Sequence, residues 1–192
     1  MTILFIIAVA LLLPYRFIIR RANRQLIFMQ RFTASQVSAD KASIIIAARN
    51  EETHIGPCLE SLLAQDFPPS QMEIIVVDDQ SVDGTAALVK SYADRGIRLI
   101  SLGKDEAFGK KAAIARGIAA ATHGIIITTD ADCSYSNKWI NTLLCFREKM
   151  DAVFVAAPVQ FRKEISLLDR FQSLDFMALQ GITAAGVSGK YL

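Results

Sequence analysis

The chain has 192 residues, of which 52% are hydrophobic and 21% are charged. This composition predicts one globular domain with a substantial core and excludes an intrinsically disordered protein. The formal net charge is +2, but five arginines fall within the first 31 residues and the first acidic residue is Asp40, so the rest of the chain carries 16 basic and 19 acidic residues. A slightly acidic body is a poor match for nucleic acid, and we discount that class of partner.

The cysteines and histidines restrict the metal chemistry open to this chain. Cys58, Cys133 and Cys145 are odd in number and form no C-x-x-C pair. This pattern argues against a disulfide framework and a zinc site and favours a reducing compartment. The two histidines, His54 and His123, are far apart in the sequence. A metal site is therefore expected to use oxygen ligands.

An apolar run, Ile3–Leu13, opens the chain. Counted through Ile19 it reaches about 17 residues, the lower limit for a membrane-spanning helix. A cleaved signal peptide fits badly because a basic start and a small-x-small cleavage site are missing, whereas a peripheral interfacial helix stays open. The arginines that follow predict a cytoplasmic position for the rest of the chain. We expect a cell-membrane anchor at residues 1–19 and a basic linker at 20–41.

Beyond the linker, apolar strands alternate with helices. Strands without polar alternation, separated by helices, indicate an α/β fold with a mostly parallel sheet covered by helices on both faces. Ligands bind such sheets at the carboxyl ends of the strands, where this chain places RNEE, DDQSVDGT and TDAD. The strands are expected at 42–49, 72–79, 97–102, 124–129 and 152–161. The helices are expected at 55–63, 85–92, 110–121, 138–149 and from about residue 165.

Two aspartates end the fourth expected strand, in the stretch GIIITTDADC. Asp130 and Asp132 either cap the next helix, which is the commoner role of an isolated D-x-D, or hold a divalent cation. Three acidic strand tips on one edge are hard to explain by capping alone. Magnesium or manganese would suit the pair, since Mg²⁺ takes one or two carboxylates and completes its shell with water and substrate phosphates. A metal held there would neutralise a departing diphosphate.

A second acidic cluster follows the strand at 72–79. Asp83 and Gly84 are typical turn residues, and Asp83 is also a candidate N-cap for the helix that follows. Asp78 and Asp79 are adjacent, so one of them must point away from the turn. We expect that side chain to meet an N–H or hydroxyl group of a ligand.

Two lysines follow Gly109 at the expected start of a helix. Their spacing does not match the phosphate loop G-x-x-x-x-G-K-[ST], because Lys104 stands at the first glycine position and Lys111 at the last position. A lysine at a helix amino terminus on the ligand edge nevertheless suits an anionic group. For Lys110 and Lys111 alike, a solvated helix face is an equally open interpretation.

Five stretches together resemble glycosyltransferase family 2, whose members have the GT-A-type nucleotide-sugar-binding fold. They occur in the family's order and approximate spacing within residues 42–161: SIIIAARNEE, CLESLLAQDFP, EIIVVDDQSVDGT, GKKAAIARGI and GIIITTDADC. The resemblance implies transfer of a sugar, with inversion, from a UDP- or GDP-linked donor to a lipid or a growing polysaccharide. It also implies Mg²⁺ or Mn²⁺ as cofactor. An amino-terminal membrane helix is common among the family's membrane-bound members.

The same resemblance implies roles for individual residues. Each role is carried over only where a residue of this chain matches the family motif. The expected contacts are Asn50 and Glu51 with the nucleotide, Asp79 or Asp78 with the base or ribose, Lys110 or Lys111 with the diphosphate, and Asp130 and Asp132 with the metal and the diphosphate.

Two other classes of protein share parts of this pattern. A haloacid-dehalogenase-type phosphatase would use Asp130 as nucleophile and Asp132 as acid, but it carries its motif on the first core strand. A receiver-like signalling module has an acidic cluster resembling VVDD, but after its first strand rather than its second. Binding of a nucleoside diphosphate that requires Mn²⁺ or Mg²⁺ would distinguish the transferase from both.

The end of the chain offers no match to the family's catalytic base. Glu164, Asp169 and Asp175 fall on an expected amphipathic helix and not in the acidic pair that the family uses. We therefore expect residues 42–192 to be the donor-binding domain of a longer enzyme, with the base beyond Leu192.

Overall fold

The computed structural model describes residues 32–103, 107–161 and 165–188, together with seven separate positions: 10, 12, 14, 16, 17, 20 and 24. The chain divides into two compact units, one of residues 33–155 and one of the two chain ends, and each is treated by itself. Apart from those seven positions, the predicted anchor at 1–19 and the predicted linker up to residue 31 lie outside the described residues. Within the described part of the chain, no helix has both the length and the apolar character to cross a bilayer.

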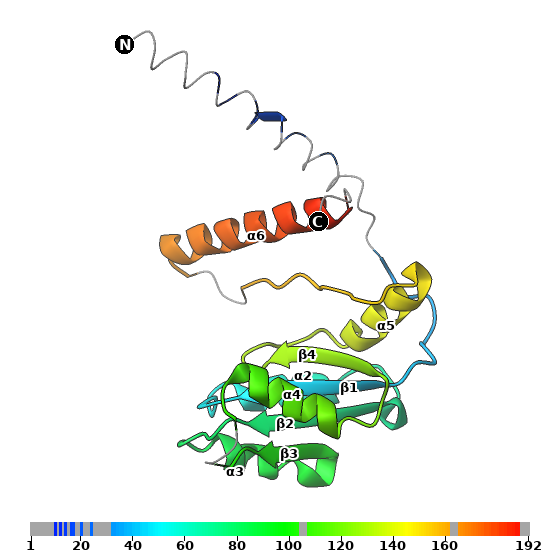
Figure 1. The fold of residues 1–192 in the computed structure, drawn as a ribbon, viewed down its shortest axis with the longest axis vertical. Helices are drawn as coiled ribbons and strands as arrows, with labels where there is room; N and C mark the ends of the chain where they lie inside the picture. The colour runs from blue at the N-terminus through cyan, green and yellow to red at the C-terminus, as the bar shows by residue number, and fades with distance from the viewer. Residues whose placement is uncertain are drawn as a thin grey trace. The chain divides into compact units, whose positions relative to one another are not determined.

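Four strands form the sheet of the 33–155 unit: β1 (Ala42–Ala48), β2 (Met72–Asp78), β3 (Ile97–Ser101) and β4 (Ile125–Asp130). Their order across the sheet is β3-β2-β1-β4, and every pairing is parallel (Figure 1). The four strands expected from apolar runs are confirmed to within one residue at each end.

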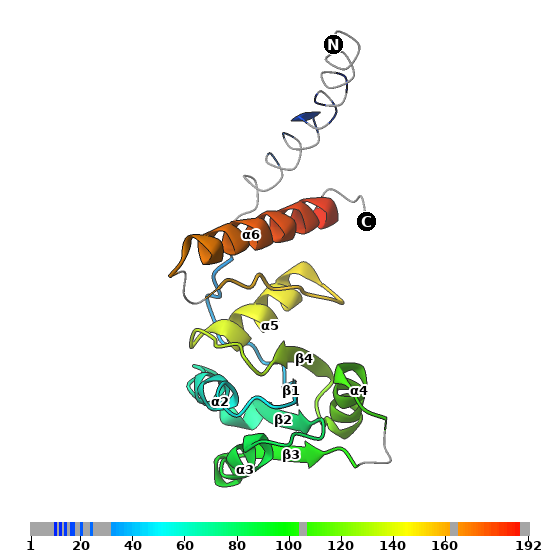
Figure 2. The ribbon, with the colours of Figure 1, turned by 90° about the vertical axis from the view of Figure 1, so that its left-hand side faces the viewer.

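Helices cover both faces of this sheet, as expected for a parallel sheet (Figure 2). One face carries α2 (Ile55–Leu63), α3 (Thr85–Lys90) and α5 (Trp139–Met150), and the other carries α4 (Lys110–Ala120). Two short 3₁₀ helices, η1 (Pro69–Gln71) and η2 (Ala93–Arg95), precede β2 and β3. The helix α6 (Leu167–Ser188) belongs to the other unit.

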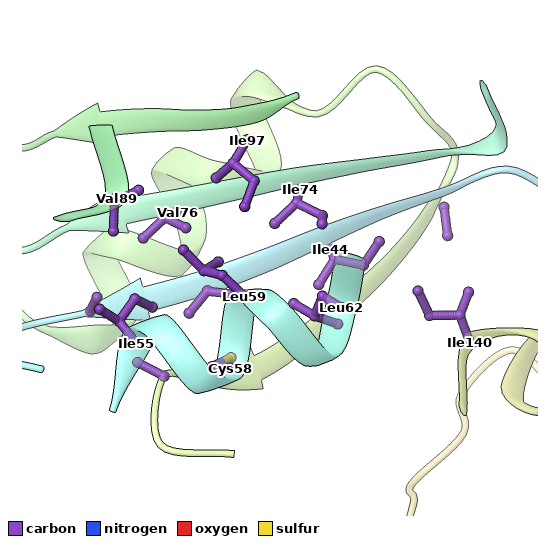
Figure 3. Close-up of a cluster of buried hydrophobic side chains, with 14 of the residues drawn as sticks. Ile44, Ile55, Cys58, Leu59, Leu62, Ile74, Val76, Val89, Ile97 and Ile140 are labelled. Carbon is purple, nitrogen blue, oxygen red and sulfur yellow. The ribbon is translucent and has the colours of Figure 1, made fainter. Parts of the chain in front are cut away.

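The apolar run of β1 is buried on both sides of the sheet. Ile44 packs with Leu59 and Leu62 of α2 in the larger core (Figure 3). Ile46 belongs to the same core, whereas Ile45 packs on the opposite face, against α4. Successive strand side chains alternate between faces, so a strand covered on both sides has to be apolar throughout. Each fully buried side chain of this kind contributes roughly 1.5–3 kcal/mol relative to an exposed one.

The alanine-rich helix α4 lies close to the sheet at Gly117. A Cβ atom added at Gly117 would stand 2.4 Å from Cγ2 of Ile45 and 3.2 Å from Cγ2 of Val77. The absence of a side chain at Gly117 therefore allows the helix backbone to approach β1 and β2. This contact fixes the position of the whole helix, including its first residue, Lys110, at the carboxyl edge of the sheet.

The prediction of a fifth strand at 152–161 is wrong. The segment has no regular structure, and the sheet has four strands among the described residues. Val153 is fully exposed and Phe154 is 84% exposed, so the apolar run is not buried. The backbone N–H and C=O of Val159 instead bond to the side-chain amide of Gln180 in α6, both at 2.8 Å. An apolar run alone does not supply the neighbouring strand that a ladder needs.

A carboxylate network closes the edge of the sheet where β1 and β2 begin. Oε1 of Glu73 accepts hydrogen bonds from Oγ of Ser43 (2.5 Å) and from N–H and Oγ1 of Thr122 (2.5 and 2.8 Å), and its Oε2 accepts one from Arg98 (3.0 Å). Burial tends to raise the pKa of Glu73, but these hydrogen bonds outweigh it and lower the pKa to about 2. The network ties the end of α4 to the start of the sheet.

Replacement of Glu73 by Gln should destabilise the fold at neutral pH by about 1–3 kcal/mol, since several hydrogen bonds to a charged group are lost. The folded-state pKa lies below the ordinary value of 4.5, so the stabilisation is complete above that pH and disappears as the pH falls towards 2. Urea unfolding at pH 7 and pH 3 should therefore show a smaller difference between parent and variant at pH 3. Glu148→Gln, on an exposed position of α5, is the control. A difference that is independent of pH would contradict the assignment.

Candidate functional site

The carboxyl ends of β1, β2 and β4 meet at one edge of the sheet. The register places Ala48 beside Asp78 and Ala47 beside Asp130, so the residues after these strands converge. They surround a cavity of about 370 Å³. Its lining consists of Ala47, Ala48, Arg49, Glu51, Asp79, Gly109, Lys110, Asp130, Ala131 and Asp132.

A larger cavity, of about 490 Å³, lies between α3 and β3. Its lining is mainly small and apolar, and Lys90 is its one charged residue. We take the smaller cavity as the candidate site because several ionisable side chains from separate elements converge there, which is what a polar ligand requires.

Asp79 joins the end of β2 to the start of α4. Its carboxylate is 5% exposed; Oδ1 accepts a hydrogen bond from N–H of Gly109 at 2.9 Å, and Oδ2 lies 3.6 Å from NH1 of Arg49. Gly109 has a backbone φ of +94°, which residues other than glycine rarely adopt. Asp79 thereby fixes the residue directly before Lys110.

Asp78 is not part of the cavity lining. It is buried, and its Oδ1 accepts the backbone N–H of Ser81 at 3.3 Å, closing the turn after β2. Of the two adjacent acids, the structure brings Asp79 into the site. Asp83 likewise serves the turn, because its Oδ1 accepts N–H of Thr85 at 3.0 Å in front of α3.

The segment after β1 contributes Glu51 to the cavity, whereas Asn50 lies outside the lining. Asn50 has φ 56°, and its Oδ1 accepts N–H of Val82 at 2.9 Å, which joins the loops that follow β1 and β2. Oε2 of Glu51 lies 3.1 Å from Nδ1 of His54. The expected roles of both residues at the nucleotide stay predictions.

Asp130 is the last residue of β4, and Asp132 follows on the exposed loop. The next helix, α5, begins at Trp139, so neither aspartate caps it and the capping interpretation is wrong. Oδ1 of Asp130 lies 2.6 Å from Nζ of Lys110, although 20 residues separate them. Lys110 lines the cavity and Lys111 does not.

Residues 130–138, which we call the aspartate loop, pack against the larger core. The phenol of Tyr135 bonds to Oγ1 of Thr129, and its ring stacks on Trp139 with centroids 4.0 Å apart. Burial is the largest cause that raises the pKa of the Cys58 thiol to about 12, and nearby Cys133 and Asp132 raise it further. Cys58, Tyr135 and Trp139 belong to the same core cluster as Ala131, which anchors the loop, while the side chains of Asp130 and Asp132 are exposed.

The carboxylates of Asp130 and Asp132 fit a hard divalent cation that also binds substrate. Among the described residues, no three His, Cys, Asp or Glu side chains converge as a complete metal site. A pair of carboxylates is nevertheless what Mg²⁺ commonly takes from a protein when phosphate oxygens and water complete its shell. The residues therefore fit a metal that is shared with a diphosphate.

Arg49 and Gly109 contribute to the site but were not predicted from the sequence as site residues. Both stand next to residues that we did select, in RNEE and in GKK, and that adjacency was the available signal. The later acid Asp169 is unsuited to the role of base. Its Oδ2 accepts N–H of Ile165 and Ser166 at 3.1 and 2.8 Å before α6, and its pKa is lowered mainly by the bond from the Ser166 backbone.

The four-stranded parallel sheet, its flanking helices and the acidic carboxyl edge define a GT-A-like fold. The mannosyltransferase PcManGT from Pyrobaculum calidifontis, solved in complex with GDP-Man and Mn²⁺, is similar at a TM-score of 0.58 and 26% identity, over 70% of this chain and 39% of that one. Staphylococcus aureus TarS 1–349 in complex with UDP shares the fold at a TM-score of 0.53 and 24% identity, over 65% and 40% of the two chains.

Residues 43–181 match the family described as Glycosyl transferase family 2. The chain therefore belongs to glycosyltransferase family 2, and the phosphatase and receiver interpretations are set aside. Its relatives include glycosyltransferase AglE of Haloferax volcanii, 35% identical over 98 residues, and the 4,4'-diaponeurosporenoate glycosyltransferase of Staphylococcus aureus, 34% identical over 96 residues. These matches cover 51% and 50% of this chain but only 32% and 25% of the relatives.

Alkylation tests the packing beneath the aspartate loop. In the folded chain at pH 8, iodoacetamide should modify Cys58 at least about 100-fold more slowly than in the unfolded chain, because the thiol is buried and very little of it is ionised so far below its pKa. The half-buried Cys133 should react before Cys58. Timed alkylation with peptide mass spectrometry measures both rates, with the urea-unfolded chain as control. Equal rates for Cys58 in the folded and unfolded chains would contradict the packing described.

Proposed function

We propose that this chain binds a nucleoside-diphosphate sugar in the cavity of about 370 Å³ and serves its transfer, with inversion, to a lipid or a growing polysaccharide. One observation carries the proposal. Asp79, Lys110, Asp130 and Asp132 line a single cavity at the carboxyl edge of a parallel sheet, in a chain that belongs to glycosyltransferase family 2.

Each of these side chains suits one part of such a donor. Asp79, which is buried and acceptor-only when ionised, suits an N–H of the base or a hydroxyl of the ribose. Lys110 suits the diphosphate as a mobile positive charge. Asp130 and Asp132 would hold Mg²⁺ or Mn²⁺, which supplies positive charge to the leaving diphosphate. Arg49, opposite Asp79, adds a second positive charge to the same cavity.

The metal and the class of donor have support from a relative of known structure. PcManGT was solved with GDP-Man and Mn²⁺, and its identity to this chain is 26%. A UDP-linked donor remains an equal candidate on the family resemblance. Inversion requires a base that takes the proton of the acceptor hydroxyl. We leave that base unassigned, since Asp169 is engaged at the start of α6.

Removal of one negative charge from the aspartate pair should weaken metal-dependent binding of a nucleoside diphosphate. Asp130→Asn and Asp132→Asn should each raise the dissociation constant for UDP or GDP in the presence of Mn²⁺ by at least about tenfold, because a metal ligand is lost. Both side chains are exposed and Asp130 loses only an exposed ion pair, so the thermal melting temperature should change by no more than about a few degrees. Isothermal titration calorimetry measures the binding, and Asp94→Asn, an exposed acid in η2, is the control. Variants that bind like the parent would exclude the pair as a metal site.

We also propose that residues 1–19 fix the chain to the cell membrane, with the rest in the cytoplasm. The support is the apolar run Ile3–Leu13 followed by five arginines before residue 32. The chain should remain in the membrane fraction after carbonate extraction, and deletion of residues 2–19 should release it. Circular dichroism of the deleted form checks that it still folds. A full-length chain that carbonate extracts completely would contradict the anchor.

A further inference from the structure

Two carboxylates of the candidate site, those of Asp79 and Asp130, already form ion pairs with basic side chains. Nζ of Lys110 lies 2.6 Å from Oδ1 of Asp130, and NH1 of Arg49 lies 3.6 Å from Oδ2 of Asp79. Asp132 makes no ion pair with any described residue. Asp130 and Asp132 therefore differ, because the carboxylate of Asp130 is already paired with the ammonium group of Lys110.

The backbone at Lys110 is fixed, whereas its ammonium group is able to move. Asp79 accepts the N–H of Gly109, and Gly117 holds α4 against Ile45, so the start of the helix has a set position. The Lys110 side chain is 63% exposed and the Asp130 side chain is 54% exposed. A lysine side chain is a charge on a flexible four-carbon stem. Lys110 can therefore reach Asp130 or another anion in the same cavity without any movement of the helix.

Lys110 and a divalent cation compete for Asp130. An ammonium group at 2.6 Å occupies Oδ1, and a second positive charge on the same carboxylate would be repelled by it. The competition ends when an anion enters the cavity and pairs with the ammonium group of Lys110 in place of Asp130. A diphosphate is such an anion.

We propose that Lys110 exchanges partners, from Asp130 in the free protein to the diphosphate in the complex, and thereby couples metal binding to nucleoside-diphosphate binding. This inference rests on the proposed function and deepens it. Without the nucleotide, Lys110 weakens the hold of Asp130 on a metal. With the nucleotide, Lys110 leaves Asp130 and strengthens the hold on the diphosphate. The coupling is reciprocal, as linkage between two binding equilibria requires.

The exchange predicts opposite effects of one substitution on two ligands. Lys110→Met keeps the side-chain stem and removes the charge. It should tighten the binding of Mn²⁺ alone by about two- to fivefold, the effect expected from release of an exposed ion pair. It should also weaken the binding of UDP or GDP without metal by a similar factor. A lysine that only supported the local structure would weaken both when replaced.

The binding of Mn²⁺ alone is measured by electron paramagnetic resonance of the free ion, and that of UDP and GDP by calorimetry with and without Mn²⁺, on the 192-residue chain in mild detergent. Lys110→Arg, which keeps the positive charge, should restore both affinities towards the parent values. Lys111→Met, one residue further along α4 and outside the cavity lining, is the matched control. Melting temperatures within about a few degrees of the parent, the effect of losing one exposed ion pair, exclude a difference in folding.

The outcomes separate this inference from the proposed function. Tighter Mn²⁺ binding together with weaker nucleotide binding in Lys110→Met supports the exchange. Mn²⁺ binding that is unchanged or weaker in Lys110→Met overturns it, even if the parent binds nucleotide well. Failure of the parent to bind either nucleoside diphosphate in the presence of Mn²⁺ would overturn the proposed function itself, whatever Lys110→Met does to the metal.

Discussion

The parallel pairing of β1 with both β2 and β4 is the constraint on which the candidate site depends. Parallel strands end at the same edge of a sheet, and the register sets Ala48 beside Asp78 and Ala47 beside Asp130. A slip of one residue would turn the side chains of a strand to the opposite face. Such a slip is costly because the isoleucines of β1 are fully buried on both sides of the sheet. The core therefore determines the position of the carboxylates.

The helix α4 transmits this constraint to the positive side of the cavity. At one end Asp79 accepts the N–H of Gly109, and just beyond the other end Glu73 accepts two hydrogen bonds from Thr122. Between them, Gly117 allows the helix to lie against the sheet. The backbone is thus held at three places, while the Lys110 ammonium remains on a flexible stem. A fixed backbone that carries a lysine on a flexible stem is suited to a ligand that brings its own negative charge.

Part of this arrangement could be predicted from local patterns, and part could not. Buried strands were correctly predicted from runs such as SIIIAA, because a strand covered on both faces must be apolar at every position. The same reasoning failed at 152–161, where Val153 and Phe154 are exposed and Gln180 bonds to the backbone of Val159. An apolar run shows only that a segment is able to be buried. Whether a neighbouring strand or helix covers it depends on distant parts of the chain.

The sequence by itself determined the order of the elements, the acidic tips of the strands and the motifs of glycosyltransferase family 2, because hydrophobic periodicity and residue type are local properties. Only the tertiary structure decided between adjacent candidates, bringing Asp79 rather than Asp78, and Lys110 rather than Lys111, into the cavity. It also brought in Arg49 and paired Lys110 with Asp130. These contacts join residues 20 to 30 positions apart. The contacts of Gly109 and Lys110 depend on the rotation of α4 about its axis and on its distance from the sheet, which the packing of Gly117 against Ile45 sets.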